Sequence, residues 1–494
     1  MPSKKIKPLQ THYECARSVY APCPLDNKEI PVSINGHFHL NGVGLDIKSK
    51  VVRERLEFRY PKTIWQQYPS ENKQRLIDNI SYLFTAHLPL LTGRPLRLEF
   101  KTRYPQIFSW VTECLLRFTP SYPYLHQGQK GDDKMEGLRT ILNRRVYFAP
   151  SKPLQGKARP SNEKNIVIPF TFGKDSFLTY HLAKDIGLNP TLVYFNEPTE
   201  EYTRQHKLNL ISAFSKESGE TVYFTDNSFG RLRAFGSGWF GWELALSSWA
   251  LFALPFAYAK RARYIVFANE ASCNHAFYDK DGLKVMPQYE QSWQATEAMS
   301  AVTQTLSGGT VFTTSFLEGI YESGVIALLK ARYHSSLKYL MSCWAETKAA
   351  KFNRWCGVCA KCARMYLYLL ANDVDPAFVG FKTNMLAKNK ADLFEIFHSP
   401  KDMGGALATD REEQLLAFYI LCLKGCEEPL VQRFKKSPHF NFVQKNFKSL
   451  VARYYSLHAE AITPAPWRGK LHAIINGVLK KRVSELYKLQ KKNK

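Results

Sequence analysis

A short polar turn separates an apolar strand pattern from a helical pattern. Residues 171–176 read Thr-Phe-Gly-Lys-Asp-Ser and follow the strand-like run NIVIPF. Backbone N–H groups at a helix start favour an anion such as pyrophosphate, and hydroxyl groups and a lysine strengthen such a site. Asp175 suits Mg²⁺ better than an anion. The turn predicts a phosphate site, and a plain helix cap is the alternative. The candidate binding residues are Thr171, Gly173, Lys174, Asp175 and Ser176.

Four cysteines have a spacing that suits one metal ion. Cys343, Cys356, Cys359 and Cys362 follow the pattern C-x12-C-x2-C-x2-C. Four thiolates can close a tetrahedral zinc site, which leaves no position open for chemistry. An iron–sulfur cluster is the alternative, because closely spaced cysteines also hold such clusters. The spacing favours a structural Zn²⁺ in a reducing compartment.

Polar residues also end two predicted strands. Asn196 closes the run PTLVYFN, and Glu270 closes the run RYIVFANE. Ligands of open parallel sheets bind beyond the carboxyl ends of the strands, so both residues are expected near the polar turn. Glu270 is a candidate general base or Mg²⁺ ligand, with a strand-end cap or salt bridge as the alternative.

The elements around these residues alternate between strand and helix. Four short apolar runs, NIVIPF, PTLVYFN, TVYFTDN and RYIVFANE, are separated by helical stretches. This alternation predicts an α/β fold with a mainly parallel open sheet and helices on both faces. The most apolar stretch, 244–259, contains two serines and a proline. It is shorter than the roughly 20 apolar residues that cross a bilayer, so a buried helix and no membrane span are expected.

Three regions are expected along the chain. Residues 1–160 show an alternation typical of a strand-rich α+β domain with a mostly antiparallel sheet. A linker rich in Pro, Gly, Ser and Lys covers 151–165. Residues 161–379 form the α/β domain with the cysteine site. Residues 380–494 form a basic helical region, whose end is interpreted as solvated, with RNA contact as the alternative.

The composition is globular and strongly basic. The 494 residues carry a formal net charge of +25, with 45% hydrophobic and 22% charged residues. This balance excludes wholesale disorder and favours anionic partners such as nucleotides or RNA. No apolar segment follows the basic N-terminus, so no signal peptide is expected. The predicted location is cytoplasmic.

The turn resembles the S-G-G-x-D-S pyrophosphate loop of the PP-loop ATP pyrophosphatase superfamily. Phe172 departs from the motif, because it stands where the first glycine is expected. The resemblance implies a sheet of the HUP type, ATP and Mg²⁺ as cofactors, and adenine near Asn196. The matching positions are Thr171, Gly173, Asp175 and Ser176.

Turn and cysteines together resemble two branches of this superfamily. One is the 7-cyano-7-deazaguanine synthase branch, and the other is the ATP-dependent UDP-N-acetylmuramoyl-L-alanyl-L-glutamate epimerase family. The second is closer, because YIVFANEAS is similar to its G-N-E-x-S strand end and WCGVCAKC to its W-C-x-x-C-x-K-C segment. The resemblance covers roughly residues 165–395. It implies a zinc knuckle at the cysteines and catalytic roles for Lys174, Asp175 and Glu270.

The resemblance implies that a substrate carboxylate attacks the α-phosphorus of ATP and pyrophosphate leaves. The expected partner is an anionic, carboxylate-bearing small molecule. In the epimerase branch the resulting acyl-adenylate makes an α-proton acidic, whereas in the deazaguanine branch ammonia captures the adenylate. Two alternatives stay open. One is a tRNA-modifying enzyme with tRNA as partner, and the other is a degenerate nucleotide-binding protein, which Phe172 favours.

Overall fold

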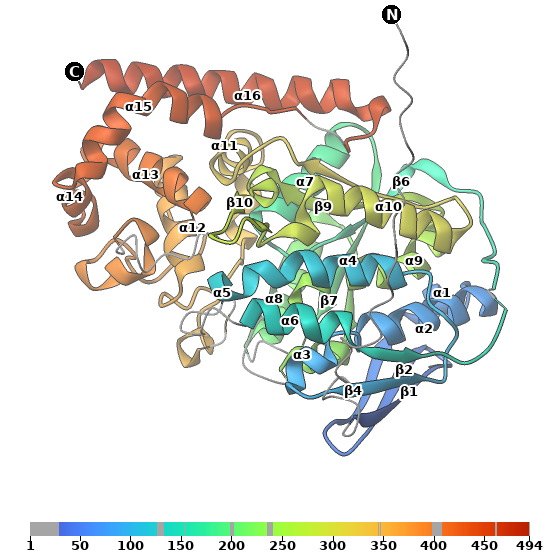
Figure 1. Ribbon diagram of the computed structural model, residues 1–494. Coiled ribbons are helices and arrows are strands. Elements are labelled where there is room, and N and C mark those ends of the chain that lie inside the picture. Colours follow the sequence, from blue (N-terminus) through green and yellow to red (C-terminus); the bar gives the residue numbers. More distant parts are fainter. Residues whose placement is uncertain are drawn as a thin grey trace, which may run out of the picture.

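Two five-stranded sheets and a layer of C-terminal helices make up the described part of the chain (Figure 1). The computed structural model describes residues 29–125, 133–152, 154–197, 202–234, 241–343, 345, 347–397, 408–459 and 462–493. The predicted mixed α/β architecture is confirmed. None of the described helices combines the length and the apolar character that a membrane crossing needs.

The second sheet is entirely parallel and has the order β12-β9-β6-β7-β8. Strand β6 lies at its centre, so the turn that follows β6 lies in the middle of the carboxyl edge. The four strands predicted from apolar runs are present, and β12 is an addition. Their bounds are β6 (Asn162–Pro169), β7 (Asn189–Asn196), β8 (Val222–Asp226), β9 (Ala262–Glu270) and β12 (Phe312–Leu317).

Alternate residues of the strands feed two separate cores. Ile166 and Ile168 of β6 pack with helices on one face, whereas Val167 belongs to the core of the other face. This alternation follows from the two-residue period of a strand. The first face is covered by α7 (Lys174–Asp185), α8 (Thr203–Ser218) and α11 (Glu322–Arg332), and the second by α9 (Ala245–Lys260) and α10 (Trp293–Ser307).

Helix α9 is buried along most of its length, as its predominantly apolar sequence predicts. It also joins the two sheets, since the ring of Phe252 stacks on Phe58 of the first sheet with centroids 4.0 Å apart. The first sheet and one face of the second therefore share a core. The division near residue 160 stays a prediction, and β6 already begins inside the expected linker.

The first sheet has the order β3-β2-β1-β4-β5. Strands β1, β2 and β3 are antiparallel, but β1–β4 and β4–β5 are parallel, because helices connect these strands. The expectation of a mostly antiparallel sheet therefore holds for one half only. The elements are β1 (Ile30–His39), β2 (Gly42–Lys48), β3 (Arg53–Arg59), α1 (Lys62–Trp65), α2 (Ser70–Leu83), α3 (Leu88–Thr92), β4 (Leu96–Phe100), α4 (Phe108–Phe118), α5 (Tyr122–Leu125), α6 (Asp133–Leu142) and β5 (Arg145–Tyr147). A small hairpin, β10 (Phe277–Tyr278) and β11 (Lys284–Val285), follows β9.

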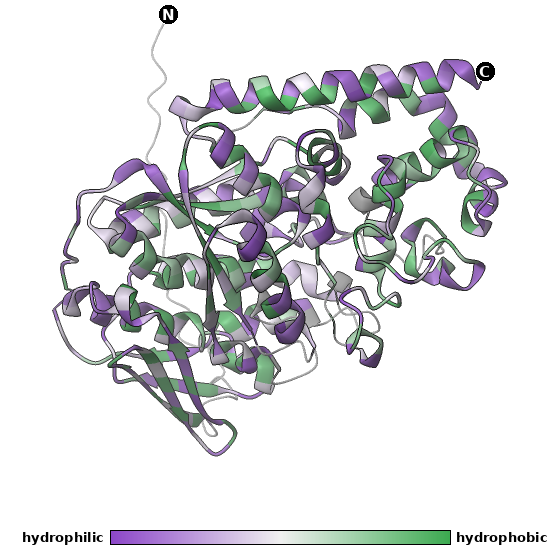
Figure 2. Cartoon of the chain, turned by 180° about the vertical axis from the view of Figure 1, so that it is seen from behind, coloured by the Kyte–Doolittle hydropathy of each residue, from purple (hydrophilic) through white to green (hydrophobic). Residues whose placement is uncertain are grey.

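The C-terminal region is helical, as expected, but its last helix, α16 (Ala465–Lys492), is not a free end. Helix α16 lies across the second sheet and α11 (Figure 1), and it buries Trp467, Leu471, Ile475, Leu479 and Leu486. Figure 2 shows apolar positions along α16 and a hydrophilic C-terminal end. The other helices are α12 (Ala360–Ala371), α13 (Ala408–Leu423), α14 (Pro429–Lys435) and α15 (Pro438–Tyr454).

Candidate functional site

The polar turn lies where the central strand β6 ends and α7 begins. Gly173 is the residue before the helix, so the N-cap position itself has no capping side chain. The Gly173 N–H donates to the Thr171 hydroxyl at 3.4 Å, and the Ser176 hydroxyl donates to the Gly173 carbonyl at 3.1 Å. The plain helix cap stays the alternative to a phosphate site. The N–H groups of the first turn and the helix dipole make this end of α7 suitable for an anion.

Phe172 supplies the backbone conformation that a glycine would supply. Its φ is +61°, in the left-handed region that side chains disfavour. Its ring is fully buried, with centroids 4.8 Å from Phe170 and 5.6 Å from Phe177. The side chain therefore points into the core of the α7 face and leaves the anion-facing side of the turn to the backbone. The aromatic core holds Phe172 in a strained conformation.

Two replacements separate the strain of Phe172 from its packing. Both Phe172→Ala and Phe172→Gly remove the buried ring, so each is expected to lower the free energy of unfolding by about 3 kcal/mol or more. The glycine variant should be the more stable of the two by about 1 kcal/mol, because glycine adopts φ near +60° without strain. Chemical denaturation measures the difference. Equal stability, or a more stable alanine variant, would contradict the left-handed turn.

Lys174 is buried among carboxylates. Its Nζ lies 2.7 Å from Asp175 Oδ1 and 3.7 Å from Glu322 Oε2, and Arg364 approaches the other oxygen of Glu322 at 3.3 Å. Burial lowers the pKa of Lys174, but Asp175, Glu322 and Glu270 outweigh it and raise this pKa overall. The lysine is therefore charged. Burial raises the pKa of Asp175 against the pull of Lys174.

Glu270 lies beside this group, at the end of β9. It accepts hydrogen bonds from the Ser272 N–H at 3.0 Å and from the Ser272 hydroxyl. Burial, opposed by Lys174 and supported by Glu322 and Asp175, raises the pKa of Glu270 to about 8. A carboxyl group that titrates near neutral pH can act as an acid or a base. The strand-end cap is also present, through the bond from Ser272.

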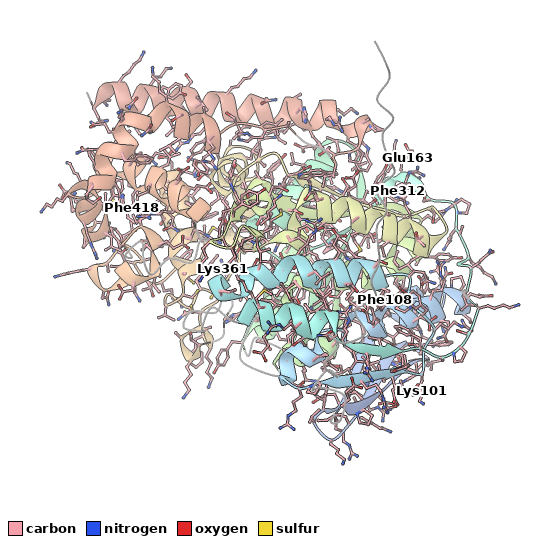
Figure 3. The ribbon with its side chains drawn as sticks, in the orientation of Figure 1. Lys101, Phe108, Glu163, Phe312, Lys361 and Phe418 are labelled. Atoms are coloured by element: carbon pink, nitrogen blue, oxygen red, sulfur yellow. The ribbon has the colours of Figure 1, made fainter. Side chains whose placement is uncertain are left out.

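The structure adds three charged residues that sequence reasoning missed. Glu322 begins α11 after β12, Arg364 lies on α12, and Glu413 lies on α13. Glu413 accepts the Ser323 N–H at 2.6 Å, and its burial raises its pKa well above the usual range. Burial raises the pKa of Glu322, but Arg364, Lys174 and Lys361 outweigh it and lower this pKa overall. Figure 3 labels Lys361 of α12, between the C-terminal helices and the two sheets. The C-terminal helices therefore contribute to the site.

The predicted residues do not all meet. Thr171, Gly173 and Ser176 lie in the turn with Lys174 and Asp175, and Glu270 lies close by. Asn196 lies at the end of β7, the neighbouring strand, and its amide donates to Asp226 on β8 at 3.2 Å. Its Oδ1 is buried without a hydrogen-bond partner. Adenine binding at Asn196 stays a prediction.

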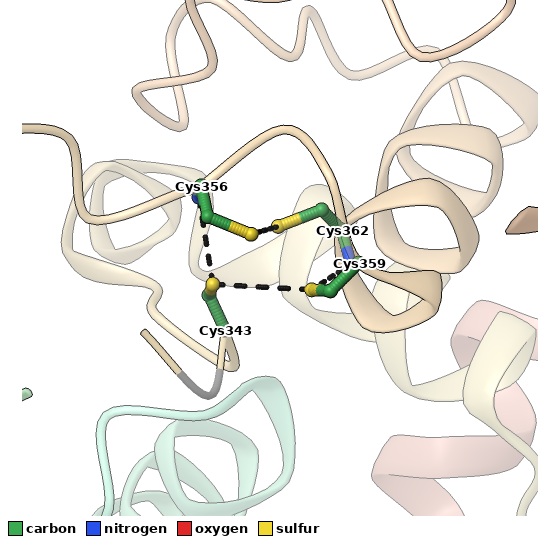
Figure 4. A group of neighbouring side chains, drawn as sticks. All are labelled: Cys343, Cys356, Cys359 and Cys362. Atoms are coloured by element: carbon green, nitrogen blue, oxygen red, sulfur yellow. Dashed lines mark hydrogen bonds between the residues drawn. The ribbon is translucent and has the colours of Figure 1, made fainter. Parts of the chain in front are cut away.

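The four cysteines converge on one point (Figure 4). Their sulfur atoms all lie within 4.8 Å of one another. The Sγ atoms of Cys356 and Cys362 are 3.7 Å apart, and those of Cys343 and Cys359 are 4.0 Å apart. Tetrahedral zinc with bonds of about 2.3 Å places sulfurs about 3.8 Å apart. The group could therefore hold a metal ion such as zinc. Backbone N–H groups of Ala345, Cys356, Val358 and Cys362 point at its sulfurs.

The cysteine group is tied to the polar turn through its backbone. The N–H of Met341, two residues before Cys343, donates to the Phe172 carbonyl at 2.8 Å. Buried Lys207 of α8 bonds the carbonyls of both segments, Thr171 at 2.6 Å and Met341 at 2.8 Å. A displacement of the metal-binding segment would therefore move the turn.

A second buried carboxyl group lies toward the first sheet. Glu243 is 2% exposed, and one of its oxygens accepts the Gly241 N–H at 2.8 Å while the other has no hydrogen-bond partner. Burial raises the pKa of Glu243 to about 7. An unfolded chain gives up this proton at lower pH, so the free energy of unfolding falls as pH rises from about 4.5 to 7 and stays low above that.

Replacing this group removes its pH dependence. The free energy of unfolding of Glu243→Gln should not show this fall. Between pH 5 and pH 8 it should therefore rise by about 2–3 kcal/mol relative to that of the wild type. Urea denaturation at both pH values measures the relative shift. Glu163→Gln is the matched control, because the Glu163 side chain is 65% exposed. A shift equal to that of the control would mean that Glu243 ionises normally.

No protein-family model matches the sequence, and the search of curated proteins gives no match.

Proposed function

We propose that this chain is an ATP-dependent adenylating enzyme of the PP-loop type, which activates a substrate carboxylate as an acyl-adenylate and releases pyrophosphate. The observation that carries the proposal is the turn 171–176. It follows the central strand of a parallel sheet, Gly173 precedes the helix without a capping side chain, and Phe172 has a φ of +61°, which glycine adopts without strain. The strand order, with the crossover beside β6, agrees with a HUP-type sheet and with ligand binding at that edge.

The residues of the turn fit a bound pyrophosphate group. The free N–H groups of α7 and the hydroxyl of Thr171 would hold the phosphate oxygens. Asp175, whose side chain is 29% exposed, would hold Mg²⁺ through its carboxylate. Mg²⁺ supplies charge neutralisation of the phosphates when it is bound. Lys174 is neutralised by Asp175 and Glu322, so in this arrangement it orients Asp175 rather than reaching a phosphate.

The chain's own groups would then favour departure of pyrophosphate. The fixed N–H groups of the turn stabilise negative charge that grows on the leaving phosphate. Glu270, with a pKa of about 8, is the residue best placed to move a proton during the later step.

The four cysteines would hold Zn²⁺ as a structural knuckle. Their separations agree with tetrahedral coordination, and four thiolates leave no position for substrate. The Met341–Phe172 hydrogen bond gives the metal a second role in this proposal, which is to hold the turn in place.

The acceptor class follows from the proposed branch. In the epimerase hypothesis the acceptor is a muramoyl peptide with a terminal glutamate, whose α-proton becomes acidic after adenylation. The deazaguanine-synthase-like and tRNA-modifying hypotheses share the adenylation step and differ in the acceptor. Glu270 favours the epimerase hypothesis, because this reaction alone needs a proton-transfer group on the substrate carbon.

Release of pyrophosphate and AMP tests the proposal. ATP and Mg²⁺ are supplied with UDP-N-acetylmuramoyl-L-alanyl-L-glutamate, with 7-carboxy-7-deazaguanine and an ammonium salt, or with bulk tRNA. We expect acceptor-dependent release of both products with the first acceptor. Release with one of the others would keep the adenylation and change the branch. ATP binding without release in all three mixtures would favour the degenerate nucleotide-binding protein.

A further inference from the structure

The outer surface of the C-terminal helices carries a large uncompensated positive charge. Residues 429–494 contain fifteen Lys and Arg but two Glu, so this short segment holds about half of the net charge of +25. Ten described lysines of the segment are exposed, and we call them the lysine face. They are Lys435, Lys436, Lys445, Lys448, Lys470, Lys480, Lys481, Lys488, Lys491 and Lys492.

The lysines of α16 lie on one side of the helix. Lys470, Lys481 and Lys488 repeat at intervals of seven and eleven residues, and 100° per residue brings such positions to the same side. The opposite side carries the buried residues Trp467, Leu471, Ile475, Leu479 and Leu486. The stripe from Lys470 to Lys492 spans about 33 Å at 1.5 Å per residue.

Helix α15 extends the same surface. Its exposed residues Phe442, Lys445 and Lys448 follow the helical period, and Phe442 is 44% exposed. The helices meet where the Tyr487 hydroxyl donates to the Lys448 carbonyl at 3.3 Å. Figure 3 shows long side chains with nitrogen tips projecting from this end of the molecule.

The charge is not used within the fold. Among the residues that the structure describes, none of the ten lysines has an ion pair with a carboxylate, whereas Arg453 and Arg482 of the same helices do. Clustered like charges repel one another, so an exposed set without counter-charges is suited to a polyanion.

We propose that the lysine face binds the phosphodiester backbone of nucleic acid. Lysines along about 33 Å match a row of phosphates, and the exposed ring of Phe442 offers a surface for stacking of an unpaired base. A membrane surface is a weaker match, because the apolar side of α16 is already buried in the fold and cannot insert. An acidic protein is also a weaker match, because a protein interface needs an apolar centre, and Phe442 is the one large exposed apolar residue in the described part of 429–493. The inference does not depend on adenylation, because binding is measured without ATP.

Fluorescence anisotropy of the full chain tests this proposal with three probes. They are an RNA hairpin with a single-stranded loop, a DNA duplex of the same length, and vesicles containing about 30% phosphatidylserine. We expect the RNA or the DNA to bind, with an affinity that falls steeply as salt rises, since each neutralised phosphate releases counterions. Tighter binding of the RNA hairpin than of the DNA duplex would identify RNA as the source of the phosphates. Equal affinity for the two would mean that the protein recognises the phosphodiester backbone alone. Vesicle binding without nucleic-acid binding would overturn the proposal.

Two matched variants locate the binding surface. One replaces Lys480, Lys481, Lys488, Lys491 and Lys492 by glutamine, and the other replaces Lys48, Lys50, Arg53, Lys62 and Lys101, which are exposed around the first sheet and α1. Both remove five charges, and thermal unfolding checks that both stay folded. The first variant should weaken binding at least about tenfold and make the salt dependence of the affinity shallower, by a slope of about one for each phosphate that is no longer neutralised. Equal weakening in both variants would mean that binding follows net charge, and the lysine face would be rejected.

Discussion

Cys356→Ser is expected to release the metal and to loosen the polar turn together. Serine is a poor zinc ligand, and the free energy of metal binding is part of the free energy of folding. We expect the zinc content to fall from about one to near zero per chain and the melting temperature to fall by roughly 10 °C or more. Because Met341 and Lys207 join the cysteine segment to the turn, the Kd for ATP should also rise about tenfold.

Metal analysis, thermal unfolding and ATP titration of one preparation check this result. Cys422→Ser is the control, since Cys422 is a free cysteine on α13 away from the four-cysteine group. If the wild-type protein contains iron and shows the absorbance of an iron–sulfur cluster, the four cysteines hold such a cluster and not zinc. Loss of metal with unchanged ATP affinity would contradict the coupling between the cysteine group and the turn.

Asp175→Asn is expected to abolish ATP cleavage and leave the fold intact. The substitution keeps the shape of the side chain but removes the charge proposed to hold Mg²⁺. It also removes the negative charge that pairs with Lys174, whose Nζ donates to Asp175 Oδ1 at 2.7 Å. Pyrophosphate release should fall by about 10³-fold or more, because both the metal charge and the geometry of the turn are affected. ATP binding without Mg²⁺ should change little or strengthen, since an anion near the phosphates is removed.

Asp185→Asn is the matched control for this variant. Asp185 lies at the other end of the same helix, where it accepts hydrogen bonds from Arg332 and Tyr333. It should keep wild-type turnover and lose only a small part of its stability. Full activity in Asp175→Asn would remove this residue from the mechanism.

The sequence predicted the parts of the site that are formed by residues close to one another in the chain. The turn after NIVIPF, the strand end at Glu270 and the four cysteines are each defined within about 20 residues, and a turn or a metal knuckle forms from neighbouring residues. The sequence also predicted the parallel α/β sheet, because the apolar runs and helical stretches alternate plainly.

The rest depends on contacts between distant segments. Glu322, Arg364 and Glu413 lie roughly 150 to 240 residues from Lys174 along the chain, and no spacing marks them as part of one group. The resemblance could not predict the conformation of Phe172. Its side chain could block the anion side of the turn, or its backbone could adopt a positive φ that directs the ring into the core. The packing of the ring against Phe170 and Phe177 decides between the two. The sequence predicts a solvated end because residues 480–494 hold seven basic residues against one acidic residue. That charge balance does not reveal that the apolar residues of α16 share one buried side.

Exchange of labelled pyrophosphate into ATP is the most direct test of adenylation at the turn 171–176. Exchange requires reversible attack on the α-phosphorus, and it does not depend on how the adenylate is used afterwards. We expect exchange that needs Mg²⁺ and a carboxylate acceptor, is retained in Asp185→Asn and is absent in Asp175→Asn. Exchange that persists in Asp175→Asn, or release of inorganic phosphate from the γ-position in place of pyrophosphate, would contradict it.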